Sequence, residues 1–93
     1  MNSFILIDTE VGKASSVAQG VRGIAGVEFA EIVTGPYDLV VKAWTATEDQ
    51  LVHEVEPTIR SIPGVTRTVA CPMVARELVF ESPTRGSMAE ATP

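Results

Sequence analysis

Cysteine, histidine and clustered basic residues are scarce in this 93-residue sequence, and each shortage excludes a class of protein. The single cysteine, Cys71, cannot form an internal disulfide, which indicates a reducing compartment. With only one histidine as well, the sequence offers no set of four ligands for a structural zinc ion. The seven lysines and arginines are dispersed and are outnumbered by twelve acids. A direct nucleic-acid binder normally carries a basic patch, so we do not expect this protein to bind nucleic acid directly.

Long apolar runs are missing too. No run approaches the roughly 20 residues that a membrane-spanning helix needs. The N-terminus has neither a basic start nor an apolar run long enough for a signal peptide. We therefore expect a cytoplasmic protein without a membrane segment, built as a single domain.

A short polar segment between two β-branched apolar runs is the clearest local signal in the sequence. Gly35 permits positive φ, Pro36 fixes φ, and Asp38 can hydrogen-bond to its own backbone. Apolar runs on both sides of such turn formers predict a β-hairpin.

Hydrophobic periodicity predicts the other elements on either side of this hairpin. In chain order we expect a strand at residues 3–8, a helix at 12–23, strands at 27–34 and 38–45, a helix from 47 to 62, and a strand at 65–74 with a short extension at 77–80. Asp8 or Thr9 is expected to cap the first helix and Thr47 the second. Pro57 should kink the second helix or restart it, because proline lacks the N–H donor and crowds the preceding turn.

A short internal echo supports this order of elements. Residues 24–27 read IAGV and residues 62–65 read IPGV, and in each copy a glycine separates a helical pattern from a strand. Two β-α-β units in the order βαββαβ predict an α+β, ferredoxin-like sandwich with both helices on one face of the sheet. The third strand would place Val40, Lys42 and Trp44 on the other face, which is too apolar for solvent. We therefore expect a partner subunit there.

Several single residues have simple structural interpretations. Lys42 is expected to form a salt bridge, with Asp38 or Glu31 as the nearby acids. Cys71 alternates with apolar neighbours and is interpreted as a small buried hydrophobic residue. His53 is interpreted as an exposed helical residue.

The hairpin segment Thr34-Gly35-Pro36-Tyr37-Asp38-Leu39, together with residues 62–65 before a strand, resembles the ligand-binding domain of the Lrp/AsnC transcription regulators. This domain is also called the RAM (regulation of amino-acid metabolism) domain. The resemblance assigns residues 1–80 to a RAM-like domain. Residues 81–93 are predicted to be a disordered tail, because they are rich in Ser, Thr, Pro, Gly and Ala and contain few apolar residues. The resemblance implies dimers whose sheets face each other as a dimeric α-β barrel, gathered into rings of dimers. Because the sequence starts at the first strand, before which family members usually carry a helix-turn-helix domain, we expect the stand-alone form.

The resemblance also implies a site for an amino acid or a related small molecule near the hairpin turn. By position, the residues implied to line it are Thr34, Gly35, Tyr37 and Asp38, with Arg67 and Thr68 from the fourth strand. Asp38 would hold an ammonium group, and Tyr37 would supply an apolar wall with a polar tip. Co-assembly with full-length Lrp/AsnC regulators, and modulation of them, is the expected role.

No nucleophile, base and orienting group stand at a recognisable spacing, so we expect a non-enzymatic module without metal or cofactor. Two alternatives stay open. One is a small dimeric ferredoxin-like enzyme of the cofactor-free monooxygenase kind, with Trp44 facing a pocket between sheets. The other is a purely structural assembly module, which is favoured by Pro36 because the family usually has a polar or charged residue there.

Overall fold

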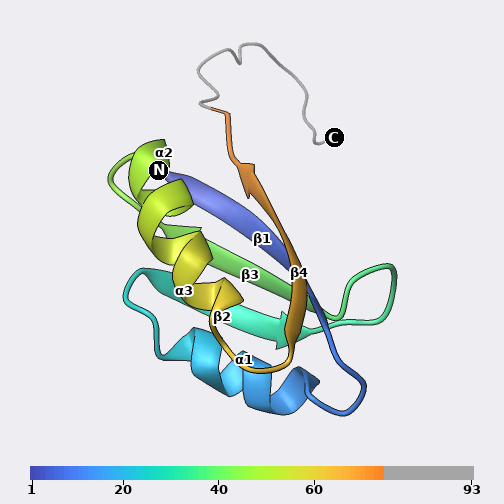
Figure 1. Ribbon diagram of the computed structural model, residues 1–93. Helices are drawn as coiled ribbons and strands as arrows, with labels where there is room; N and C mark the ends of the chain where they lie inside the picture. The colour runs from blue at the N-terminus through green and yellow to red at the C-terminus, as the bar shows by residue number, and fades with distance from the viewer. Residues whose placement is uncertain (75–93) are drawn as a thin grey trace, which may run out of the picture.

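The computed structural model describes residues 1–74, whose elements follow the order βαββαβ (Figure 1). In chain order they are β1 (Asn2–Thr9), α1 (Ala14–Arg22), β2 (Val27–Ile32), β3 (Leu39–Trp44), α2 (Glu48–Gln50), η1 (Leu51–Val55), α3 (Glu56–Arg60) and β4 (Val65–Pro72). The predicted strand extension at 77–80 and the predicted tail at 81–93 lie outside the described residues. Within residues 1–74, no helix has the length and apolar character needed to cross a membrane.

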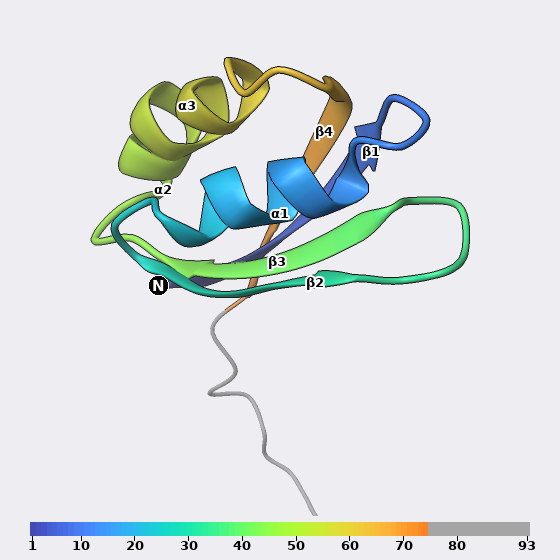
Figure 2. The same cartoon turned by 90° about the horizontal axis from the view of Figure 1, so that it is seen from below.

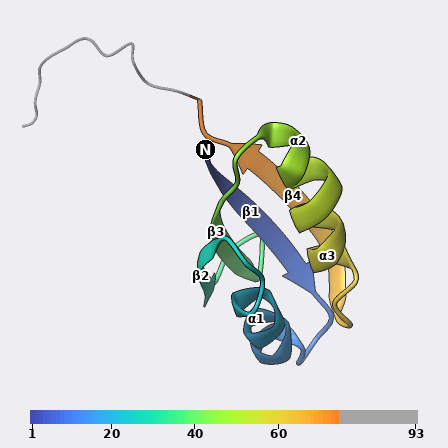
Figure 3. The same ribbon diagram turned by 90° about the vertical axis from the view of Figure 1, so that its left-hand side faces the viewer.

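One antiparallel sheet holds the four strands in the order β2-β3-β1-β4. The central strand β1 pairs with β3 on one side and with β4 on the other. Both helical regions cover the same face of this sheet (Figures 2 and 3). The predicted ferredoxin-like fold is therefore confirmed.

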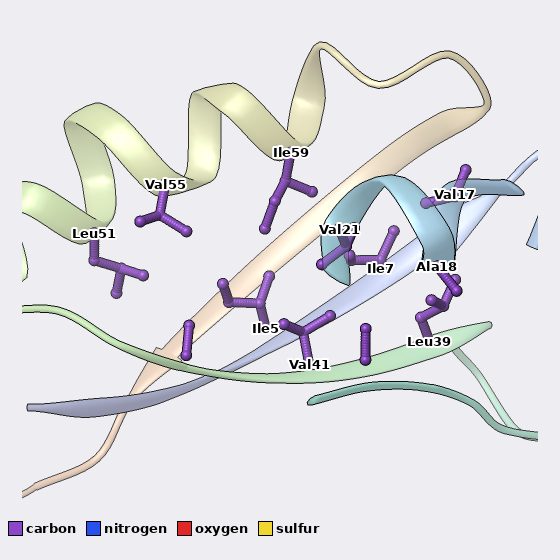
Figure 4. Packing of buried hydrophobic residues seen from close by; sticks show 12 residues of the cluster. Ile5, Ile7, Val17, Ala18, Val21, Leu39, Val41, Leu51, Val55 and Ile59 are labelled. Atoms are coloured by element: carbon purple, nitrogen blue, oxygen red, sulfur yellow. The ribbon is translucent and has the colours of Figure 1, made fainter. Parts of the chain in front are cut away.

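The core lies between the sheet and the helices that cover it (Figure 4). Alternate residues of the two central strands face inward, and Ile5, Ile7, Leu39 and Val41 are fully buried. The helical side chains that meet them are Val17, Ala18, Val21, Leu51, Val55 and Ile59. Burial of one large aliphatic side chain stabilises the fold by about 1.5–3 kcal/mol.

The first helix begins later than its predicted start, because the residues expected to cap it belong to β1. Pairing between β1 and β4 continues through Asp8 to Thr9. The chain then turns through residues 10–13, and α1 starts at Ala14. Lys13 occupies the N-cap position without a side-chain capping hydrogen bond. The prediction that Asp8 or Thr9 caps this helix is therefore wrong.

The second helical region confirms both of its predicted features. Thr47 caps it, since the Gln50 N–H donates to Thr47 Oγ1 at 3.0 Å. Ahead of Pro57 the α-helix widens into the π-helical turn η1, in which the Glu56 N–H donates to the Leu51 carbonyl, and it then restarts as α3. A wider turn suits a proline, which has no N–H and whose ring crowds the turn before it.

The internal echo in the sequence is also a repeat of structure. In residues 24–27 and again in 62–65, the valine N–H bonds to the isoleucine carbonyl at 3.2 Å. Gly26 and Gly64 adopt φ angles of 92° and 101°, which L side chains rarely adopt. One turn leads into β2 and the other into β4.

The face of the sheet away from the helices carries apolar side chains. The residues on this open face include Phe4, Leu6, Phe29, Val40, Trp44 and Val69. Trp44 keeps 55% of its surface exposed in the single chain. This side of the third strand is as apolar as the sequence suggested, and no element of residues 1–74 covers it.

Lys42 forms a salt bridge on the open face, as predicted, but with a different acid. Its Nζ lies 3.4 Å from Glu28 Oε1. The expected partners were Asp38 and Glu31. The bulge where β2 shifts register against β3 brings Glu28 within reach, and the bulge could not be read from the sequence.

Cys71 is exposed, and its predicted burial is wrong. It is the cross-strand partner of Phe4, so its side chain lies on the open face. The alternation with its apolar neighbours was interpreted correctly, but no helix covers the face that they share.

Candidate functional site

The β2–β3 loop reaches past the end of the sheet, beyond α1 (Figure 2). β2 ends at Ile32 rather than at the predicted residue 34, so the loop spans residues 33–38. A backbone hydrogen bond of 2.9 Å between its first and last residues closes it. Thr34, Gly35 and Pro36 are all exposed at its tip. The two predicted site residues at this tip therefore face solvent and are accessible.

Asp38 ties the base of this loop to the end of β1. Its Oδ2 accepts the Thr9 N–H at 2.8 Å and the Thr9 hydroxyl at 3.2 Å. Its own N–H donates to the Ile7 carbonyl at 2.9 Å. The half-buried Asp38 side chain thus has a structural role in positioning the hairpin. Its predicted role with a ligand ammonium stays a prediction.

Tyr37 and Arg67, two of the predicted site residues, are brought together from distant parts of the sequence. The Arg67 guanidinium carbon lies 5.3 Å from the centroid of the Tyr37 ring, which is a cation–π arrangement. Tyr37 comes from the β2–β3 loop and Arg67 from β4, with β1 between β3 and β4 in the sheet. The two side chains therefore meet across β1.

Thr68 lies on the other side of the sheet from its neighbour Arg67, because successive strand residues face opposite ways. The Thr68 hydroxyl donates to Glu56 Oε2 at 3.1 Å on the helix-covered face. The same carboxylate oxygen lies 3.4 Å from Arg60 Nη1, and the Glu56 side chain is only 14% exposed. The structure therefore does not gather all six predicted site residues into one cluster, and Thr68 belongs to a network with α3.

Residues 1–74 contain no group of three or more His, Cys, Asp or Glu side chains that is placed to hold a metal ion. His53 is exposed, as predicted, and its Nε2 lies 3.4 Å from Asp49 Oδ1 one helical turn earlier.

A family model described as the Lrp/AsnC ligand binding domain matches residues 2–81. The match runs from β1 through β4 and includes the hairpin that carried the resemblance. The chain belongs to this family. The family resemblance of the hairpin and of residues 62–65 is thereby confirmed, whereas the roles of single site residues stay predictions.

Relatives of this Lrp/AsnC domain include both regulators and small proteins. The HTH-type transcriptional regulator FL11 of Pyrococcus horikoshii is 37% identical over 68 residues, which is 73% of this chain and 44% of the regulator. The chain thus spans less than half the length of that relative. The hypothetical protein PHS023 from Pyrococcus horikoshii has a TM-score of 0.71 at 28% identity, over 86% of this chain and 98% of its own. A transcriptional regulator from Neisseria meningitidis, NMB0573 in complex with L-Met, shares the fold with a TM-score of 0.70 at 22% identity, over 81% of this chain and 50% of its own.

Three residues of this Lrp/AsnC domain escaped the sequence-based interpretation. Asp8 and Thr9 were assigned to a helix cap, although continuing the alternation of β1 would have placed Asp8 on the open face beside β4. Glu56 was not singled out, and its spacing of four from Arg60 was the one available signal. Its contact with Thr68 depends on how α3 packs on β4, which no local pattern encodes.

Proposed function

We propose that the protein is an oligomeric effector-binding module of the Lrp/AsnC kind that senses an amino acid or a closely related small molecule. The observation that carries this proposal is the family match over residues 2–81. The family is a ligand-binding domain of transcription regulators, which favours binding over catalytic turnover. The complex of the Neisseria regulator with L-Met supports an amino acid as the ligand class.

The hairpin end of the sheet has the groups that such a ligand needs. The exposed tip at residues 34–36 offers backbone groups, Tyr37 offers a flat apolar surface, and Arg67 offers a cation beside it. A carboxylate matches the fork of N–H donors on a guanidinium. The proposed site therefore lies at this end, where a neighbouring subunit can enclose it.

A second copy of the chain is the proposed cover for the open face. Phe4, Leu6, Val40 and Val69 lie side by side on neighbouring strands there, and Trp44 is more than half exposed. Contiguous apolar surface of this kind typically marks a protein interface. Pairing sheet to sheet would bury these side chains and form the dimer that the family resemblance implies.

Full-length Lrp/AsnC regulators are the proposed partners beyond the homo-oligomer, in the cytoplasm. The regulator FL11 contains a region like this chain within a polypeptide more than twice as long. A domain with the same pairing face could exchange with that region and alter the assembly of the regulator. Direct contact with nucleic acid is not part of the proposal.

The enzyme alternative gains no support from the described pocket. A surface pocket of about 460 Å³ lies at the far end of the sheet from the hairpin, lined by Met1, Asn2, Met73 and Val74. None of these side chains is a general acid or base. The α-amino group of Met1 already donates to the Thr45 carbonyl at 2.8 Å.

The melting temperature with each of the twenty L-amino acids tests the sensor proposal. A ligand at 100 times its Kd stabilises the folded state by about 2.7 kcal/mol, so one amino acid or a small group should raise the melting temperature by several degrees. Tyr37→Ala should abolish most of this rise, whereas Val11→Ala, at a fully exposed site, should preserve it. A chain that none of the twenty stabilises would contradict the amino-acid sensor and favour the purely structural module.

A further inference from the structure

Two opposite charges stand side by side at the hairpin end of the sheet. Asp8 and Arg67 are direct cross-strand partners in β1 and β4. Because Ile5 and Ile7 point into the core, the alternation of β1 places Asp8 on the open face, and its partner Arg67 shares that face. Among residues 1–74 the ion pairs within 4.0 Å include neither of them.

Arg67 is in contact with Tyr37 rather than with Asp8. The Arg67 guanidinium lies over the Tyr37 ring, 5.3 Å from its centroid, and not against the Asp8 carboxylate. A guanidinium resting on an aromatic ring still has its N–H donors available for a carboxylate at its edge. The ring therefore favours this position of the cation without neutralising its charge.

The carboxylate of Asp38, at the same end of the sheet, is already engaged. Asp38 accepts two hydrogen bonds from Thr9, one from the backbone N–H and one from the hydroxyl. Asp8 accepts no side-chain hydrogen bond from the described residues. Of the two acids, Asp8 is thus the one with acceptor capacity left for a ligand.

We infer that Asp8 and Arg67 together recognise the ammonium and the carboxylate of an α-amino acid, with Tyr37 packed against the ligand. The inference rests on the proposed function and assigns the polar contacts of its site. An α-amino acid carries both charges a few bonds apart, so one ligand can satisfy both side chains. A ligand with a single charge would leave one of the two without a partner, and the site should discriminate against it.

Calorimetric titration with chemically blocked ligands tests this inference on the unaltered chain. The probes are the amino acid that raises the melting temperature most, its carboxamide, which removes the carboxylate, and its N-acetyl form, which removes the ammonium. Each blocked form should bind at least about tenfold more weakly than the parent, because a hydrogen bond to a charged group is lost. Equal affinity for the parent and for either blocked form would overturn the inference.

Two variants then assign each preference to one side chain. Arg67→Gln should weaken binding of the parent amino acid and remove the preference for the free acid over its carboxamide. Asp8→Asn should remove the preference for the free amine over the N-acetyl form. Glu10→Gln and Lys13→Gln are matched controls, because they remove exposed charges from the adjacent loop, and they should retain both preferences.

The outcomes separate this inference from the proposed function. If the unaltered chain binds an amino acid but both variants keep both preferences, only the assignment of Asp8 and Arg67 is wrong. If the variants lower the oligomer mass in light scattering and leave both preferences unchanged, the pair joins subunits and the inference fails. If the unaltered chain binds none of the twenty amino acids, the proposed function fails and the inference fails with it.

Discussion

At the scale of single residues, the sequence allows two interpretations of Asp38, and its role in binding a ligand stays a prediction. Aspartate before a strand is a common turn former, and the family resemblance implies a ligand contact at the same position. The structure gives it a third role, because its carboxylate holds the Thr9 backbone N–H at 2.8 Å and so fixes the hairpin to β1. If a substitution at Asp38 abolished ligand binding, the cause could therefore be a lost ligand contact or the lost hydrogen bonds to Thr9.

Asp38→Ala should lower the free energy of unfolding by about 1.5 kcal/mol or more, since two hydrogen bonds to a charged acceptor are lost. Asp38→Asn keeps a side-chain carbonyl acceptor and should lose less. Urea denaturation measures both values, with Thr34→Ala at the exposed loop tip as the control. Equal stability of Asp38→Ala and Thr34→Ala would show that the bonds to Thr9 contribute nothing measurable.

At the scale of elements, much of the fold could be predicted from local patterns. The Thr47 cap, the interruption at Pro57 and the repeated glycine turns all depend on residues close together in sequence, and all are confirmed. The errors arose where the outcome depends on strand register or on which face of the sheet the helices cover. Cys71 has the alternation of a buried strand, but its face has no helix over it.

The site was less predictable than the fold for the same reason. The hairpin segment identified the family and placed the loop at the end of the sheet. The contact between Tyr37 and Arg67 requires β4 to lie next to β1, which is a property of the whole ferredoxin-like sheet and not of any local pattern. The bond from Thr68 to Glu56 depends on helix packing.

The turn from α1 into β2 provides a prediction at the same scale. At Gly26 the φ angle is 92°, and an added Cβ would stand 2.6 Å from the Trp44 carbonyl oxygen. Gly26→Ala should therefore lower the free energy of unfolding by at least about 1 kcal/mol more than Gly12→Ala, where φ is also positive but nothing lies within 4 Å. Thermal or urea unfolding of both variants measures the difference. Equal losses of unfolding free energy in the two variants would mean that the backbone near Trp44 moves away from the added Cβ without a free-energy cost.

At the scale of the whole molecule, the sheet has helices on one face and exposed apolar side chains on the other (Figure 3). A small domain buries a modest share of its surface, so leaving this face in water would forfeit much of the available hydrophobic stabilisation. Assembly and ligand binding are therefore linked in the proposed function, because a dimer would complete the fold and bring hairpin ends to the contacts between dimers.

Light scattering on the size-exclusion peak, with and without the amino acid that raises the melting temperature most, tests this account most directly. The account predicts a particle of two or more 9.9 kDa chains whose mass or melting temperature responds to that amino acid. Leu6→Asp, which places a charge between Val40 and Val69 on the open face, should give a folded monomer, and the fully exposed Val11→Asp should not. An unaltered chain that remains a 9.9 kDa monomer with and without ligand would contradict the central claim.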